Sequence, residues 1–181
     1  MTRESEFAGQ NDFVCGCRGS SSPSYSSLYI IDIFIIFVEN KDMNKYKHKI
    51  NYYETDKMGI THHSNYIRFM EEARVDFLDQ LGWSFIKLEN EGMASPVMSV
   101  EGVFKKSTTF PQTIEIEVGI EKLSAAKLTF SYEFTCEGEV VFLGKSTHCF
   151  LDTRGVPVLI ERKYPEFFAD LKAIYEAGKP E

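Results

Sequence analysis

The stretch YETDKMGITHHSNYIRFMEEAR, from Tyr53 to Arg74, contains the change of pattern that decides how the chain folds. It begins like the end of a strand and finishes like a helix, with Asp56, Gly59 and two adjacent histidines between. Apolar residues then recur at helical spacing from Tyr66 to Leu81 and cover roughly half of the helix circumference. An apolar arc this wide predicts a helix that a sheet surrounds, not one that lies on a surface.

We expect this helix to run from about Ser64 to Leu81, with Ser64 or Asn65 as its N-cap. Arg74 falls inside the apolar arc and Glu71 lies at its edge, three residues earlier. Because a buried charge needs a partner, the sequence predicts an ion pair between these two side chains. Such a pair is more often structural than catalytic.

Strands are indicated by residues that alternate between apolar and polar on both sides of the helix. The apolar positions are Tyr46, His48, Ile50 and Tyr52 before the helix, and Ile114, Ile116, Val118, Ile120, Leu128, Phe130, Tyr132, Phe134 and Cys136 after it. Val140–Leu151 is apolar on both faces, which predicts a central strand or one covered by a partner. Glu137-Gly138 predicts a hairpin turn, residues 96–105 form a weaker strand pattern, and residues 165–176 predict a closing helix.

The order of these elements gives the fold class. One strand comes first, a long buried helix second, and four antiparallel strands follow. We therefore expect an α+β fold in which a curled antiparallel sheet wraps around one long central helix.

Length and composition restrict the function. A chain of 181 residues suits one domain. Its formal charge of −7 argues against a protein that binds the phosphate backbone of nucleic acids. The four cysteines have no zinc-finger spacing, so we expect no metal, and a reducing cytoplasm is the simplest location.

The first 42 residues differ from the rest. They are Gly/Ser-rich at the start, and their apolar run Leu28–Val38 is shorter than the ~20 residues that span a bilayer. We expect residues 1–42 to be a leader, disordered or non-native, with Met43 as the natural start and residues 43–181 as the domain. A genuine extension that adds an edge strand is the alternative.

The opening stretch also carries the candidate chemistry. Asp56 follows a strand, Gly59 permits a sharp turn, and the N–H groups around His62–Asn65 form the helix N-terminus. A helix N-terminus stabilises a developing oxyanion, and a carboxylate opposite it can attack a carbonyl or activate a water. Taken alone, however, an aspartate at this position is more often a turn or capping residue than a catalytic one. The adjacent histidines do not form a metal site, because adjacent side chains diverge and no third ligand is visible.

The same residues resemble a known family. YYETDKMGITHHSNYIRFMEEAR is similar to the signature of hotdog-fold acyl-CoA thioesterases of the 4-hydroxybenzoyl-CoA thioesterase type, most of all the short-chain branch associated with the Tol–Pal system. The matching positions are Asp56, Gly59, His63, Asn65, Tyr66, Phe69, Glu71, Ala73 and Arg74. The resemblance covers about residues 43–177. His62 departs from it, since an aromatic is usual there, and so does Thr61, where an aliphatic is common.

The resemblance implies roles for these residues. Asp56 would be the nucleophile or general base, the backbone N–H near His63 would polarise the thioester carbonyl, and the His63 side chain and Glu71 would assist. The expected substrate-binding residues are Gly59, Ile60, His62, Asn65, Tyr66, Lys105 and Lys106. Such enzymes need no cofactor and bind CoA at a subunit interface. A homodimer or homotetramer is therefore implied, with an acyl-CoA substrate, no nucleic acid and no membrane span.

Two other functions stay open from the sequence. A hotdog acyl-thioester dehydratase would use a His/Glu pair, which His63 and Glu71 could supply. A non-catalytic acyl-thioester binding module would use the same pocket. An acyl-carrier-protein substrate in place of CoA is a further alternative.

Overall fold

The computed structural model describes residues 43–179. The elements are β1 (Tyr46–Lys49), the 3-10 turn η1 (Tyr52–Glu54), α2 (His63–Gln80), α3 (Phe85–Asn90), β2 (Val97–Phe104), β3 (Thr113–Leu123), β4 (Lys127–Cys136), β5 (Glu139–Cys149), α4 (Ile160–Lys163) and α5 (Pro165–Ala177). The predicted leader, residues 1–42, lies outside the described residues. Within those residues, no helix combines the length and the apolar character needed to cross a membrane.

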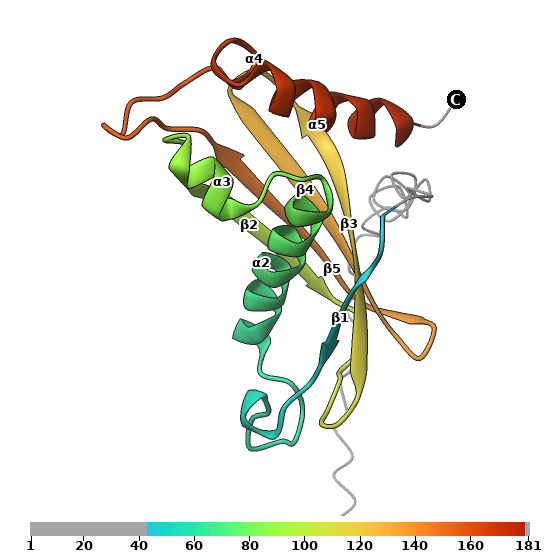
Figure 1. Ribbon diagram of the computed structural model, residues 1–181. Coiled ribbons are helices and arrows are strands. Elements are labelled where there is room, and N and C mark those ends of the chain that lie inside the picture. Colours follow the sequence, from blue (N-terminus) through green and yellow to red (C-terminus); the bar gives the residue numbers. More distant parts are fainter. Residues whose placement is uncertain (1–42, 180–181) are drawn as a thin grey trace, which may run out of the picture.

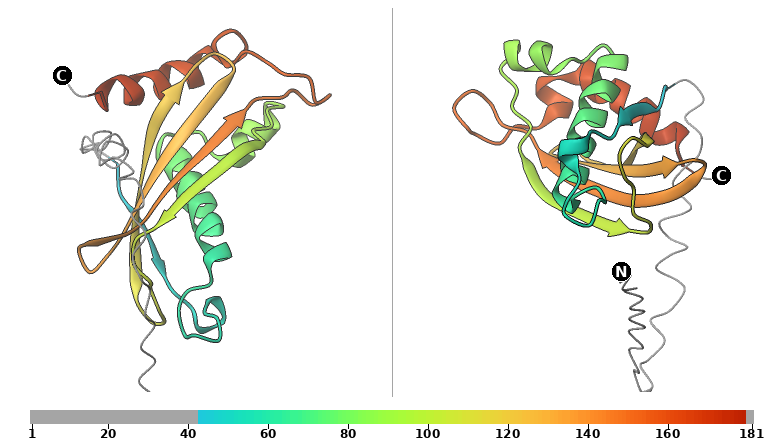
Figure 2. Two further views of the ribbon diagram at one scale, coloured as in Figure 1. Left: turned by 180° about the vertical axis from the view of Figure 1, so that it is seen from behind. Right: turned by 90° about the horizontal axis from the view of Figure 1, so that it is seen from below.

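The five strands form one antiparallel sheet in the order β1-β3-β4-β5-β2. The sheet curls around α2, which lies along its concave face (Figure 1), and α5 crosses one end of the sheet (Figure 2). The predicted α+β fold with one central helix is confirmed. The strand predicted to be apolar on both faces, β5, lies inside the sheet between β4 and β2.

The core forms where the apolar positions of the strands meet the helix. Ile116 and Phe134 are opposite each other on β3 and β4 and are fully buried. From the helix side, Phe69, Met70 and Ala73 are buried against this face. The period-2 pattern of the strands and the wide arc of α2 therefore bury complementary surfaces, at about 1.5–3 kcal/mol for each large apolar side chain.

The start of α2 differs from the prediction. His62 is the N-cap, and its ring Nδ1 accepts a hydrogen bond from the Ser64 N–H (3.3 Å). The prediction of Ser64 or Asn65 was wrong because Asn65 has another role. Its buried side-chain amide donates to the carbonyl of Glu54 (2.8 Å), which ties α2 to the preceding turn.

The predicted ion pair between Glu71 and Arg74 was also wrong. Arg74 is 7% exposed and donates to Nε2 of His148 on β5 (3.1 Å), whereas Glu71 lies on the exposed face of the helix. Two residues expected in apolar faces are exposed as well. Tyr52 is 78% exposed because β1 ends before it, and Ile67 on α2 is 52% exposed.

Candidate active site

A tight turn of five residues positions Asp56. The Asp56 N–H donates to the carbonyl of Ile60 and the Gly59 N–H donates to the carbonyl of Asp56, both at 2.9 Å. Gly59 has a φ of 76°, a conformation that residues with a side chain rarely adopt. Oδ1 of Asp56 accepts a hydrogen bond from the Met58 N–H (2.7 Å). The predicted role of Asp56 as a turn residue is thus real, but it occupies only one carboxylate oxygen.

The same turn occurs a second time, at residues 152–156. The Asp152 N–H donates to the carbonyl of Val156, and the Gly155 N–H donates to the carbonyl of Asp152, both at 2.9 Å. Gly155, like Gly59, has a φ of 76°. Here both carboxylate oxygens are occupied. Oδ1 accepts the N–H groups of Arg154 and Val156, and Oδ2 accepts the Arg154 guanidinium (2.9 Å). The Val156 N–H and then the Arg154 side chain lower the pKa of Asp152 to about 2.

The Asp56 carboxylate has fewer hydrogen-bond partners than the Asp152 carboxylate. Met58 stands where the second turn has Arg154, so no guanidinium reaches the Asp56 carboxylate. Among residues 43–179, Oδ2 of Asp56 has no hydrogen-bond partner and no ion pair. The backbone turn is shared, but among residues 43–179 the Asp56 carboxylate accepts only the Met58 N–H, so its Oδ2 is available for chemistry.

The N-terminus of α2 supplies the opposite charge. His63 is the first residue of the helix, and its backbone N–H has no hydrogen-bond partner within the described part of the chain. The residues before it are held in place, because the His62 N–H donates to the carbonyl of Glu54 and the Thr61 N–H to that of Thr108, both at 2.8 Å. A fixed helix end with a free N–H is a site for a negatively charged oxygen.

Asp56 and His63 line the same cavity, of about 310 Å³. Its lining residues come from the turn that holds Asp56, the N-terminal end of α2 and the end of β2 with the residues that follow it. The other residues that line it are Met58, Ile60, Thr61, Tyr66, Phe104, Lys105, Lys106 and Ser107. A free carboxylate, a helix N-terminus, an apolar wall and two lysines therefore share one space.

Thr61 and Tyr66, which line this cavity, join a network of buried hydroxyl groups centred on Thr108. Oγ1 of Thr108 lies 2.8 Å from Oγ1 of Thr61 and 3.0 Å from the hydroxyl of Tyr66. Burial raises the pKa of Tyr66, so its hydroxyl stays protonated. This network accounts for Thr61, where the family pattern commonly has an aliphatic. Thr108 was not predicted, because nothing local marks it and its partners are more than 40 residues away.

A histidine clamp holds the segment that leads to Asp56. The ring of His48 lies between two carboxylates, with Nε2 3.0 Å from Glu54 and Nδ1 3.1 Å from Glu72. Glu54 also accepts the Asn51 N–H (2.7 Å), and the Tyr46 hydroxyl donates to Glu72 (3.1 Å). Burial and the Glu72 charge raise the pKa of Tyr46 to about 12. The clamp joins β1, η1 and α2, so it fixes where the loop can go.

Of the predicted site residues, six line the cavity and four do not. Those that line it are Asp56, Ile60, His63, Tyr66, Lys105 and Lys106. Gly59 shapes the turn, His62 caps the helix and Asn65 ties the helix to η1. Glu71 lies apart, in an open depression that Tyr46, Arg68 and Asp79 also line. Met58, Phe104 and Ser107 line the cavity without having been predicted, because they carry no local motif.

The two lysines differ in their surroundings. Lys106 pairs with Glu139, whereas Lys105 has no carboxylate within 4 Å among residues 43–179. Two other strand lysines, Lys127 and Lys145, do not line the cavity, and Lys145 pairs with Glu121 (2.9 Å).

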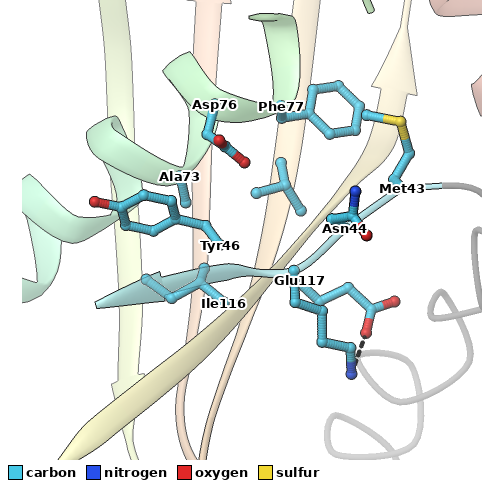
Figure 3. Close-up of a pocket in the computed structure, with 10 residues that line it drawn as sticks. Met43, Asn44, Tyr46, Ala73, Asp76, Phe77, Ile116 and Glu117 are labelled. Carbon is cyan, nitrogen blue, oxygen red and sulfur yellow. Dashed lines mark ion pairs between the residues drawn. The ribbon is translucent and has the colours of Figure 1, made fainter. Parts of the chain in front are cut away.

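A second hollow, of about 240 Å³, opens between the start of β1 and α2 (Figure 3). Its charged groups are already engaged. Lys45 pairs with Glu117 (2.8 Å), and Asp76 accepts a hydrogen bond from Gln80 (2.7 Å). We assign this hollow no chemistry. In the described residues, no group of three or more His, Cys, Asp or Glu side chains could hold a metal ion.

The chain is similar to known proteins over this whole domain. The family model described as the thioesterase-like superfamily matches residues 50–173. A putative esterase of Aquifex aeolicus is 33% identical over 125 residues, which are 69% of this chain and 97% of the relative. The putative acyl-CoA thioesterase YneP of Bacillus subtilis is 28% identical over 139 residues, 76% of this chain and 98% of the relative.

Solved structures agree with these sequence relatives. A DHNA-CoA thioesterase from Staphylococcus aureus superposes with a TM-score of 0.70 at 29% identity, covering 76% of this chain and 96% of that one. The chain belongs to the thioesterase-like superfamily, as a thioester hydrolase with the hotdog fold.

Proposed function

We propose that this protein hydrolyses acyl-CoA thioesters to the free acid and CoA, with Asp56 as the catalytic carboxylate. One observation carries the proposal: Oδ2 of Asp56 is free in a turn whose second copy has both oxygens occupied. Asp56 lines the same cavity as His63, the first residue of α2. Acyl transfer needs these two parts.

The proposed reaction uses them in sequence. The thioester carbonyl oxygen accepts the free N–H of His63, and the positive end of the helix stabilises the charge that develops on it. Asp56 either attacks the carbonyl carbon or takes a proton from a water that attacks it. The C–S bond then breaks and CoA leaves as a thiolate, which takes its proton from Asp56 on the water route and from solvent on the direct route. If Asp56 attacks directly, water hydrolyses the resulting anhydride and restores the carboxylate.

The other lining residues suit the two parts of the substrate. Lys105 and Lys106 offer positive charge to CoA phosphates at the rim. Met58, Tyr66 and Phe104 form an apolar wall for the acyl group. One relative is named as an acyl-CoA thioesterase and one solved structure as a DHNA-CoA thioesterase. Both names support a CoA thioester as the substrate, but they differ in the acyl group. The short-chain, Tol–Pal-associated branch stays a prediction, as does the cytoplasmic location.

We further propose a homodimer that forms along β2. This strand is at the edge of the sheet, and all eight of its residues are exposed in the single chain. Its large apolar residues are Val97, Met98, Val100, Val103 and Phe104. An exposed apolar edge strand readily pairs with another strand. Since Phe104 also lines the cavity, pairing of two sheets here would place the cavity beside the interface. Two such dimers could then form a tetramer.

The alternatives have less support. A dehydratase would need a His/Glu pair, and His63 lines the cavity while Glu71 of the same chain does not. We therefore propose no role for Glu71 in the cavity of its own chain. A non-catalytic binding module is distinguished by experiment.

The second turn provides a matched control for that experiment. We would measure thiol release from short-chain, long-chain and aromatic acyl-CoAs for wild type, Asp56→Asn and Asp152→Asn. Asp56→Asn should lower turnover by about 100-fold or more while substrate still binds. Asp152→Asn changes the same kind of turn and should keep turnover within about twofold of wild type. Equal losses in both variants would mean that the turn, not the carboxylate, matters. Tight binding without turnover by wild type would identify a binding module.

A further inference from the structure

A buried positive charge, Arg74, lies in the C-terminal half of α2, and the proposed hydrolysis does not use it. Arg74 is 7% exposed, yet within residues 43–179 no carboxylate lies within 4 Å of its guanidinium. Its one hydrogen bond in this range is to the ring of His148. Its Cζ lies 5.7 Å from the centre of the Phe85 ring. A buried charge without a counter-ion is costly, so an anion at this place would stabilise the protein.

The polar groups around Arg74 cannot supply that anion. Arginine only donates, so Nε2 of His148 accepts and carries no proton. Oγ of Ser146, 2.8 Å from the same nitrogen, must then donate to it, and the Tyr132 hydroxyl donates to Ser146 (2.8 Å). Burial, and next the Arg74 charge, lower the pKa of His148 to about 4. Burial raises the pKa of Tyr132, so every member of the network is neutral at pH 7.

Arg74 lines a cavity of about 320 Å³ whose other walls are largely apolar. Its volume lies at the lower end of the range for small-molecule sites, ~300–1,000 Å³. The residues around it come from α2, α3, the segment between α3 and β2, β4, the segment after β5, and α5, and include Leu78, Phe85, Leu88, Phe130, Phe150 and Phe167. An exposed carboxylate, Glu89, is also among the lining residues.

This cavity is separate from the one that holds Asp56. The two share no lining residue. Arg74 follows His63 by 11 residues in α2, about 16 Å at the helical rise. The two cavities therefore lie toward opposite ends of the helix, which Figure 1 shows running along the sheet.

We infer that the Arg74 cavity binds a hydrophobic monocarboxylate, with the carboxylate on Arg74 and the apolar part among the surrounding aromatic and leucine side chains. A small inorganic anion would leave the apolar walls without contacts, and a neutral apolar molecule would leave Arg74 without a counter-ion. A free acyl or aromatic acid satisfies both. The inference does not depend on the role of Asp56, because binding here requires no hydrolysis.

The methionines allow each cavity to be observed by itself. Met93 lines the Arg74 cavity and Met58 lines the Asp56 cavity. In protein with ¹³C-labelled methionine methyl groups, titration with octanoate should shift the Met93 signal with saturation and leave the Met58 signal in place. Octan-1-ol has the same chain without the charge, and acetate has the charge without the chain. Both should bind at least about tenfold more weakly than octanoate.

Two variants test the site. Arg74→Met keeps an unbranched apolar stem without the charge and should weaken octanoate binding by about tenfold or more, whereas Arg74→Lys, which keeps the charge, should lose less. Ala94→Trp adds bulk at an exposed lining position without changing Arg74, and it should weaken binding even if Arg74→Met fails to fold. Asp56→Asn should bind octanoate like wild type. The inference is overturned if octan-1-ol binds as tightly as octanoate, if Met58 responds instead of Met93, or if Ala94→Trp leaves binding unchanged.

Discussion

Replacing His148 with glutamine should remove a large pH dependence of stability. The histidine is fully buried, and its pKa falls from 6.5 to about 4 in the folded protein, first through burial and then through the Arg74 charge. A group whose pKa is lowered by folding binds fewer protons in the folded state. Its contribution to stability is therefore complete above pH 6.5 and is lost as the pH falls toward 4.

The difference between the two pKa values sets the magnitude. A shift of about 2.5 units corresponds to about 3 kcal/mol over the full range, and to about 2 kcal/mol between pH 7 and pH 5. Glutamine can still accept the hydrogen bond from Arg74, but it does not titrate.

The assay is urea unfolding of wild type and His148→Gln at pH 7, 6 and 5. Carboxylates that titrate in this range contribute to both proteins, so the difference between them isolates the histidine. Wild type should lose about 2 kcal/mol more than the variant between pH 7 and pH 5. Parallel loss in the two proteins would refute the argument, because it would mean that the buried ring accepts a proton as easily as an exposed one.

Three further predictions follow from other parts of the structure. His48→Ala removes the ring that joins β1, η1 and α2, and should lower thioester turnover more than tenfold in the acyl-CoA assay, with His48→Gln retaining more. Val100→Glu on the exposed edge strand should give a monomer by light scattering, and an unchanged oligomer would contradict pairing along β2. Gly144→Ala would place a methyl group 2.8 Å from Phe142 and 3.0 Å from Met70, and should cost about 1–3 kcal/mol in the free energy of unfolding. An unfolding midpoint equal to wild type would show that this part of the core can adjust.

The repeated turn separates two readings of one sequence pattern. Residues 56–60 and 152–156 make the same backbone hydrogen bonds around an aspartate and a glycine. The carboxylates differ in their partners, since Asp152 accepts the Arg154 guanidinium and the Val156 N–H, whereas Asp56 accepts only the Met58 N–H among residues 43–179. The pattern by itself therefore indicates a turn, and the residue two positions after the aspartate decides whether its carboxylate stays free.

The sequence by itself determined the five strands, the central and closing helices and their order, but not η1, α3 or α4. Period-2 alternation on β3 and β4 and the wide apolar arc of α2 are local properties, because each follows from the geometry of one element. The sharp turn at Gly59 and the candidate carboxylate at Asp56 were likewise visible, since a few adjacent residues define them. The same holds for the hairpin between β4 and β5, whose two residues both have positive φ.

Only the tertiary structure decided which distant groups meet. Arg74 was expected to pair with its helical neighbour, but His148, 74 residues away, lies opposite it across the core. Thr108, in the loop between β2 and β3, contacts Thr61 and Tyr66 of the candidate active site across the fold. Such contacts depend on how the sheet curls around the helix and on which strands become neighbours. No local spacing encodes that curvature, so the charge left without a partner, and the cavity beside it, could be found only in the folded chain.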